Sequence, residues 1–303
     1  MRTDAISLLT ACLALHASSP VLAQEEPAPD VTPVALTEMQ PEFDSAEAVL
    51  TALEEDDQAL RTFDSRIAYT TINDLGGAIT RRTGEIAFES EAADTATPRR
   101  RFAIRFETLL RGERYLTDDR ALQTIAFDGR WLWEKIHSEM QVNKREIVRQ
   151  GESVDPFELG DGPFPPLPIG QQKDDILRRY DVRLVPSDDS LAPDPDLDER
   201  FEDEKREKEM AEALVKFAQG SVQLRLVPRG AEPRFAEIRL WYKPDDDGRL
   251  LPRMSRTVDA QSRDISIVQL MHPLSINGPA REDLLQVTVN EGWSLSETRL
   301  PAP

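Results

Sequence analysis

The sequence predicts a mostly β protein of the α+β class, whose short strands form a barrel, a sandwich or a strongly curved sheet. Three observations predict it. Short runs alternate between apolar and polar residues with a period of two along most of the chain. Clusters of glycine, asparagine and aspartate separate these runs at near-regular spacing. A single amphipathic helix precedes the first run, so helices are expected to be accessory to one dominant sheet.

The N-terminal residues predict export. Ala5 to Ala17 is a short apolar run, and Val21-Leu22-Ala23 places small residues at the −3 and −1 positions of a signal-peptidase site. We therefore expect residues 1–23 to be a signal peptide cleaved after Ala23, and the protein to be periplasmic. The alternative is lipidation at Cys12, which we disfavour because few apolar residues precede that cysteine.

Composition narrows the classes of partner. Residues 24–43 are rich in proline, glutamate and alanine and predict a disordered spacer before a domain over 44–303. The formal net charge of −19 argues against binding to a phosphate backbone, so no nucleic-acid partner is expected. Cleavage after Ala23 removes the single cysteine, which excludes disulfides and thiolate metal sites. No later segment approaches about 18 uninterrupted apolar residues, which predicts a soluble mature protein.

A helix is expected from Asp44 to about Thr62. Asp44-Ser45-Ala46-Glu47 resembles a capping box, and Val49, Leu50 and Leu53 recur at helical spacing. The period then changes to two, which predicts strands. We expect them near residues 67–69, 85–88, 101–107, 146–148, 182–185, 222–227, 236–242, 251–258, 265–270 and 284–289.

The stretch from Leu122 to Trp133 predicts a tight β-hairpin. Asp128-Gly129 between two apolar runs favours a two-residue type I′ turn, which pairs Ala126 with Trp131. One face then carries Trp131 and Trp133. The opposite face carries the other apolar residues of the hairpin, Ile125, Phe127 and Leu132. Both faces are apolar, so both must be covered.

Two segments interrupt the strands. Residues 160–170 hold four prolines with Phe164, Leu167 and Ile169 between them, which predicts a stiff apolar loop, either a rigid connection closing the core or a lid over a cavity. A short helix is expected at 171–180. A charged helical insertion is expected at about 187–219, and its acidic stretch 188–212 carries twelve acidic and four basic residues. Only the end of this insertion has an apolar face that could dock.

The order of these elements resembles the LolA-like family of periplasmic carriers, the outer-membrane lipoprotein-sorting proteins. The resemblance spans about Asp44 to Pro301. The matching segments are Gly84-Glu85-Ile86-Ala87-Phe88, Phe102 to Phe106, Phe127-Asp128-Gly129-Arg130-Trp131-Leu132-Trp133, Pro156-Phe157, Tyr180-Asp181-Val182-Arg183-Leu184, Leu224-Arg225-Leu226-Val227-Pro228 and a late Gly292-Trp293.

The resemblance implies an unclosed, strongly curved antiparallel β-barrel with helices plugging its mouth. It implies a monomeric carrier whose apolar hollow receives the acyl chains of a lipoprotein, or another lipid, for transfer toward the outer membrane. Inner- and outer-membrane transport partners are implied as well. The candidates for contact with this cargo are Ile86, Phe88, Phe102, Ile104, Phe106, Trp131 and Trp133.

An enzyme is not expected. The histidines after the leader, His137 and His272, stand isolated, so no catalytic residue, metal site or cofactor is predicted. The alternative to a carrier is an envelope interaction or sensor module with the same fold, which would have a filled interior and an outer recognition surface. An inward aromatic side chain serves a cavity wall and a packed core equally well, so the sequence leaves both open.

Overall fold

The computed structural model describes residues 43–90, 100–149, 167, 169, 172–193 and 202–301. The predicted signal peptide, nearly all of the predicted spacer and the Pro156-Phe157 segment lie outside these residues. The helices are α1 (Ala46–Ala59), α2 (Lys173–Arg179), α3 (Glu202–Ala218), α4 (Glu282–Leu285) and the 3₁₀ turn η1 (His137–Glu139). The strands are β1 (Thr62–Ile72), β2 (Ile79–Ser90), β3 (Arg100–Arg111), β4 (Arg114–Leu116), β5 (Gln123–Phe127), β6 (Trp131–Ile136), β7 (Gln141–Glu146), β8 (Tyr180–Val185), β9 (Val222–Pro228), β10 (Phe235–Pro244), β11 (Leu250–Asp259), β12 (Ile265–Ile276) and β13 (Ser294–Thr298).

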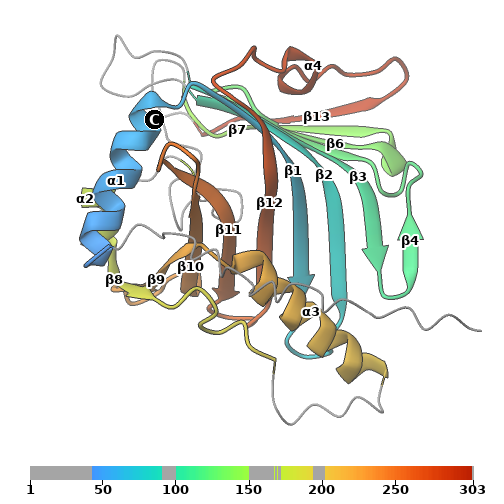
Figure 1. The fold of residues 1–303 in the computed structure, drawn as a ribbon. Helices are drawn as coiled ribbons and strands as arrows, with labels where there is room; N and C mark the ends of the chain where they lie inside the picture. The colour runs from blue at the N-terminus through green and yellow to red at the C-terminus, as the bar shows by residue number, and fades with distance from the viewer. Residues whose placement is uncertain are drawn as a thin grey trace, which may run out of the picture. The chain divides into compact units, whose positions relative to one another are not determined.

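These strands form one sheet in the order β13-β7-β6-β5-β3-β2-β1-β12-β11-β10-β9-β8, with β4 paired to β3. Neighbours are antiparallel except β13, which runs parallel to β7. No ladder joins β13 to β8 in the part of the chain described, so the sheet is not closed. The predicted mostly β fold, a curved and open antiparallel barrel, is confirmed. Figure 1 shows β12, β1, β2 and β3 side by side, with α1 alongside the β8–β11 end.

Helix α1 packs on one face of the sheet, over its β8–β11 end. Ser45 caps it by accepting a hydrogen bond from the Ala48 N–H at 3.2 Å, so Ser45 is the N-cap in place of the Asp44 suggested by the capping-box pattern. Its apolar stripe is buried together with residues of α2, β8, β9, β10 and β11. We call this set the α1 cluster: Val49, Leu50, Leu53, Ile176, Tyr180, Val222, Leu224, Leu226, Phe235, Ile238, Leu240, Tyr242 and Leu250.

The opposite face of the sheet is covered by α3 and α4. The end of α3 docks as expected, because Leu214 and Ala218 are buried against Trp241 of β10 and against apolar residues of β11 and β12. The predicted strand at 284–289 is wrong. Leu284 and Leu285 lie in α4 instead, and they pack on a row of alanines whose small side chains leave room for a helix, namely Ala87, Ala103 and Ala126.

The predicted strand at 146–148 is also displaced. Strand β7 ends at Glu146, and the backbone N–H groups of Ile147 and Val148 both donate to the carbonyl oxygen of Arg130, at 3.0 and 3.2 Å. The paired part of β7 is largely polar, so it lacks the apolar alternation by which the other strands are recognised. Among the described residues, no helix combines the length and apolarity needed to cross a bilayer.

An ion network holds three arginines together on neighbouring strands. Arg225, Arg239 and Arg256 are paired in register across β9, β10 and β11, an arrangement of like charges that costs stability. Glu237 compensates all three, since its carboxylate oxygens lie 2.6 Å from the Nε atoms of Arg225 and Arg239 and 3.7 Å from a terminal nitrogen of Arg256. Arg239 also pairs with Asp189 at 2.6 Å.

We expect Glu237→Gln to lower the free energy of unfolding at neutral pH by about 2–3 kcal/mol, because charge-assisted hydrogen bonds are lost around partly buried arginines. Burial alone would raise the pKa of Glu237, but the hydrogen bonds from Arg239 and Arg225 outweigh it and hold the pKa below its ordinary value. A depressed folded-state pKa gives stability above the unfolded-state pKa that is lost as the pH falls. Urea denaturation should therefore show wild type and variant converging in acid.

Asp181→Asn is the matched control, because Asp181 and Arg183 form an exposed pair at 3.2 Å on β8. Its loss is expected to change the free energy of unfolding by no more than about 0.5 kcal/mol. Equal losses for the two variants would contradict the role given to Glu237.

Candidate functional site

One face of the sheet carries a continuous apolar surface, which we call the concave cluster. It is built from rows of side chains that lie in register across the strands. One row runs from Ile276 of β12 through Phe63, Phe88 and Phe102 to Phe127 and Leu132. The buried members of the cluster are Phe63, Ile67, Ile86, Phe88, Phe102, Ile104, Phe106, Phe127, Leu132, Val148, Leu167, Ile169, Val268 and Leu270.

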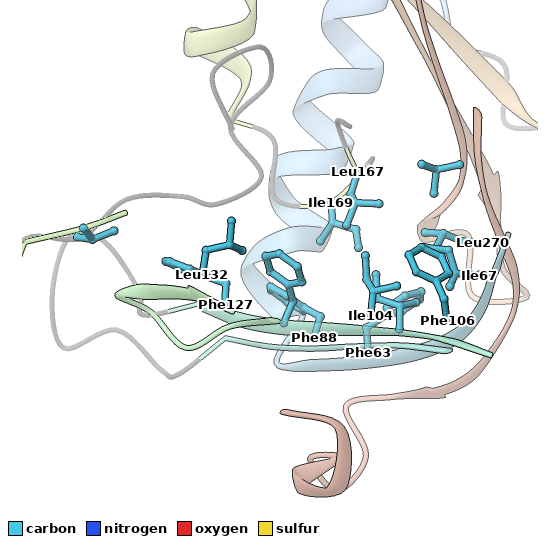
Figure 2. Close-up of a cluster of buried hydrophobic side chains, with 14 residues drawn as sticks. Phe63, Ile67, Phe88, Ile104, Phe106, Phe127, Leu132, Leu167, Ile169 and Leu270 are labelled. Carbon is cyan, nitrogen blue, oxygen red and sulfur yellow. The ribbon is translucent and has the colours of Figure 1, made fainter. Parts of the chain in front are cut away.

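Two side chains outside the sheet complete this cluster. Leu167 and Ile169 come from the proline-rich segment, and they are only 2% and 3% exposed. Figure 2 shows both of them facing Phe63 and Ile104, with α4 on the far side of the sheet. These two side chains thus contribute cover to the apolar face. This placement fits both predicted roles of the segment, closure of the core and a lid.

The cavity beneath α1 is small. It has a volume of about 50 Å³ and lies where the two clusters meet, since Phe63 and Ile169 line it together with Leu53 and Tyr242 of the α1 cluster. Pockets that bind drug-sized ligands measure about 300–1,000 Å³. An acyl chain therefore needs the cover to move before it can enter here.

The concave face becomes polar toward the β5–β7 end. The Gln123 side-chain amide donates to Glu134 at 2.8 Å, and Asn143 donates to the other oxygen of the same carboxylate at 3.4 Å. Arg82 lies nearby, with its guanidinium 5.9 Å from the centre of the Phe106 ring, and burial lowers its pKa. The apolar surface available to a ligand thus ends near Phe106.

The structure brings together five of the seven predicted cargo contacts, Ile86, Phe88, Phe102, Ile104 and Phe106. Trp131 and Trp133 do not join them. Trp133 packs with Leu284 and Leu285 on the opposite face, and Lys144, in register with it on β7, lies over both indole rings at 4.1 and 4.8 Å. Their predicted place in the cavity is wrong.

The hairpin explains this correction. Phe127 pairs with Leu132 and Ala126 with Trp133, so the register differs by two residues from that of a two-residue turn. The Asp128 carboxylate causes the longer loop by accepting from the N–H groups of Arg130 and Trp131 at 2.9 and 2.8 Å. A register shift of two residues leaves the same side chains on each face of the hairpin. The face that points toward the concave cluster, however, is the one that carries Phe127 and Leu132. Phe127 is identified as an inward residue by its pairing with Phe102 of β3, and this pairing could not be read from the sequence pattern.

Ionisable groups in the described residues do not gather into a metal site, since no three histidine, cysteine, aspartate or glutamate side chains there are placed to hold an ion. The His137 ring instead packs edge-on against Trp293, with ring centres 5.0 Å apart.

No protein-family model and no curated protein matches the chain. Among solved structures it is similar to a putative outer membrane lipoprotein-sorting protein domain from Vibrio parahaemolyticus, with 9% identity over 78% of this chain and 95% of that chain and a TM-score of 0.36. A LolA superfamily protein from Nitrosomonas europaea has 12% identity over 80% and 99%, with a TM-score of 0.32. The MucA/MucB complex from Pseudomonas aeruginosa has 14% identity over 80% and 60%, also with a TM-score of 0.32. The fold itself rests on the strand order given above.

Proposed function

We propose that the protein is a periplasmic carrier that binds the acyl chains of a lipoprotein, or of another lipid, on its concave cluster. The observation that carries the proposal is the way this cluster is covered. Its cover includes Leu167 and Ile169 of a short proline-rich segment, with α1 on the adjoining cluster, in place of a second sheet. Neither residue belongs to a strand of the described sheet, so displacing their side chains leaves its ladders intact.

The free energy needed to displace the cover is comparable to the free energy gained by burying an acyl chain. Burial of a leucine or isoleucine side chain is worth about 1.5–3 kcal/mol, so displacing Leu167 and Ile169 costs roughly 3–6 kcal/mol. Each buried CH₂ group of a ligand contributes about 0.8 kcal/mol, so an acyl chain that buries about eight of them offsets that cost. Long acyl chains are therefore favoured, and their release is helped by the return of the cover.

The decisive experiment is native mass spectrometry of the exported protein, purified from a periplasm without detergent, followed by extraction and identification of any bound lipid. We expect acylated cargo at near-stoichiometric occupancy. A protein that is empty, and stays empty when offered an acylated peptide, contradicts the carrier proposal.

The filled interior favours one second candidate, an envelope interaction or sensor module. The side chains of Ile86 and Phe102 are fully buried in the structure, and the cavity beneath α1 holds about 50 Å³. A module of this kind keeps its core closed and recognises a protein partner on its outer surface. The empty outcome above supports it, and crosslinking in the periplasm would then identify the partner.

Leu167→Ala separates a movable cover from an ordinary core residue. We expect the affinity for monolauroylglycerol to rise about tenfold, because less buried surface is lost when the cover opens. The free energy of unfolding is expected to fall at the same time. Displacement of a fluorescent apolar probe measures the first quantity, and urea denaturation measures the second.

Leu224→Ala is the matched control. Leu224 is fully buried in the α1 cluster but belongs to strand β9, so its loss should reduce stability without raising the affinity. A Leu167→Ala protein whose affinity is unchanged or reduced would show that Leu167 is not a cover that the ligand displaces.

A further inference from the structure

Tyr242 has a buried hydroxyl that finds no partner among the residues that the structure describes. The residue lies on β10, in register with Val222 and Pro252, and is 2% exposed. Its hydroxyl oxygen makes no hydrogen bond within the described structure. Buried polar groups are almost always satisfied, so an unpaired hydroxyl in this position calls for an explanation.

The buried Tyr242 side chain lies beside the cavity between the two clusters. Tyr242 lines that cavity, and so does Asp57, which lies close enough for its charge to add to burial in raising the pKa of the phenol. The phenol therefore stays protonated and keeps its hydrogen available as a donor. Asp57 itself is held by Arg100 at 2.6 Å.

The other polar groups of the cavity are already engaged. Asp56 accepts from the Leu250 N–H at 2.8 Å, and Arg249 pairs with Asp245 at 2.7 Å. The remaining wall is mostly apolar and includes Phe63 and Ile169 of the concave cluster. A ligand whose chain lies on the concave cluster would thus place its polar end beside Tyr242.

We propose that the Tyr242 hydroxyl donates a hydrogen bond to the carbonyl oxygen of an acyl ester or amide at the end of the bound chain. The inference rests on the proposed carrier function and names the chemical linkage that the site selects. A neutral carbonyl accepts from Tyr242 without burying a net charge, whereas a free carboxylate would bury one in a mostly apolar cavity whose Asp57 and Arg249 are already paired. The protein is therefore specific for acylated molecules over free fatty acids.

The test combines two proteins with two lipids. Tyr242→Phe removes the hydroxyl and keeps the ring, and the ether dodecylglycerol lacks the carbonyl of the ester monolauroylglycerol. Wild type is expected to bind the ester about three- to tenfold more tightly than the ether, the worth of one hydrogen bond. Tyr242→Phe should bind both equally, with an unchanged or higher melting temperature, because it loses an unsatisfied buried group.

Each outcome is informative. If neither protein binds either lipid, the carrier proposal itself fails. If both lipids bind and the preference for the ester is the same in Tyr242→Phe, the role of Tyr242 is overturned, and its hydroxyl serves a buried water only. Lauric acid provides a third arm, since ionised lauric acid should bind wild type more weakly than the ester does, and equal or tighter binding contradicts the proposed selectivity.

Discussion

Replacing Gly84 by alanine is expected to lower the free energy of unfolding by about 3 kcal/mol or more, because overpacking against rigid neighbours cannot relax. A Cβ atom at Gly84 would lie 1.9 Å from the carbonyl oxygen of Arg105 and 2.8 Å from the Cα atom of Phe106. Both are backbone atoms of β3, so no rotamer change relieves the clash. Urea denaturation would show the loss as a lower midpoint.

The cause is a register shift between β2 and β3. Gly84 pairs with Phe106 while Thr83 pairs with Thr108, so β3 has one extra residue here and its backbone approaches β2 closely. Gly76→Ala is the control, since its added Cβ would find Asn73 Oδ1 at 3.6 Å, an ordinary contact. If Gly84→Ala is as stable as Gly76→Ala, the close approach of the two strands is contradicted.

The alternation of side chains predicted the faces of the strands well. Phe102, Ile104 and Phe106 lie on one face as expected, and Ile86 and Phe88 join them from β2. This follows from the fixed period of a strand, which needs no knowledge of tertiary contacts. The amphipathic α1 and the docking end of α3 were predictable for the same reason, because their helical spacing identifies the buried side.

Features that depend on contacts with other segments of the chain were less predictable. The hairpin register depended on three hydrogen bonds that the Asp128 carboxylate accepts, including one from Trp133 Nε1 at 2.9 Å, and an Asp-Gly pair favours a shorter turn equally well. Strand β13 is exposed along its whole length, so no apolar pattern marks it. Leu284 and Leu285 suggested a strand, yet they pack as a helical turn on the alanine row.

The choice of inward face was the hardest of these. Both faces of the 122–134 hairpin are apolar, so periodicity says which side chains share a face and not which face is covered by the domain's own core. The alanines at 87, 103 and 126 line up across β2, β3 and β5 to form a shallow seat for α4. That row is visible only once the register of three strands is known.

Phe102→Asp is expected to lower the free energy of unfolding by about 4 kcal/mol or more, through loss of the aromatic ring and burial of an unpaired charge. Phe102 is fully buried, and its ring lies 6.2 Å from that of Phe127 between centres. Typical domains are stable by about 5–15 kcal/mol, so this variant approaches unfolding. Circular dichroism with urea denaturation measures the effect. Phe102→Leu, which keeps an apolar side chain at a cost below about 1.5 kcal/mol, keeps the site testable if the aspartate variant does not fold.

Trp131→Asp is the contrasting substitution on the other face of the sheet. The ring of Trp131 is half-buried, with Lys144 Nζ at 4.1 Å and the Arg130 guanidinium at 5.2 Å from its centre, so a carboxylate there meets two cations. Loss of these cation–π contacts is expected to cost about 1–2 kcal/mol and to leave acyl binding unchanged. A folded Trp131→Asp protein that no longer binds monolauroylglycerol would move the ligand to the tryptophan face. If Trp131→Asp still binds monolauroylglycerol and Phe102→Leu binds it more weakly than wild type, the ligand is assigned to the concave cluster.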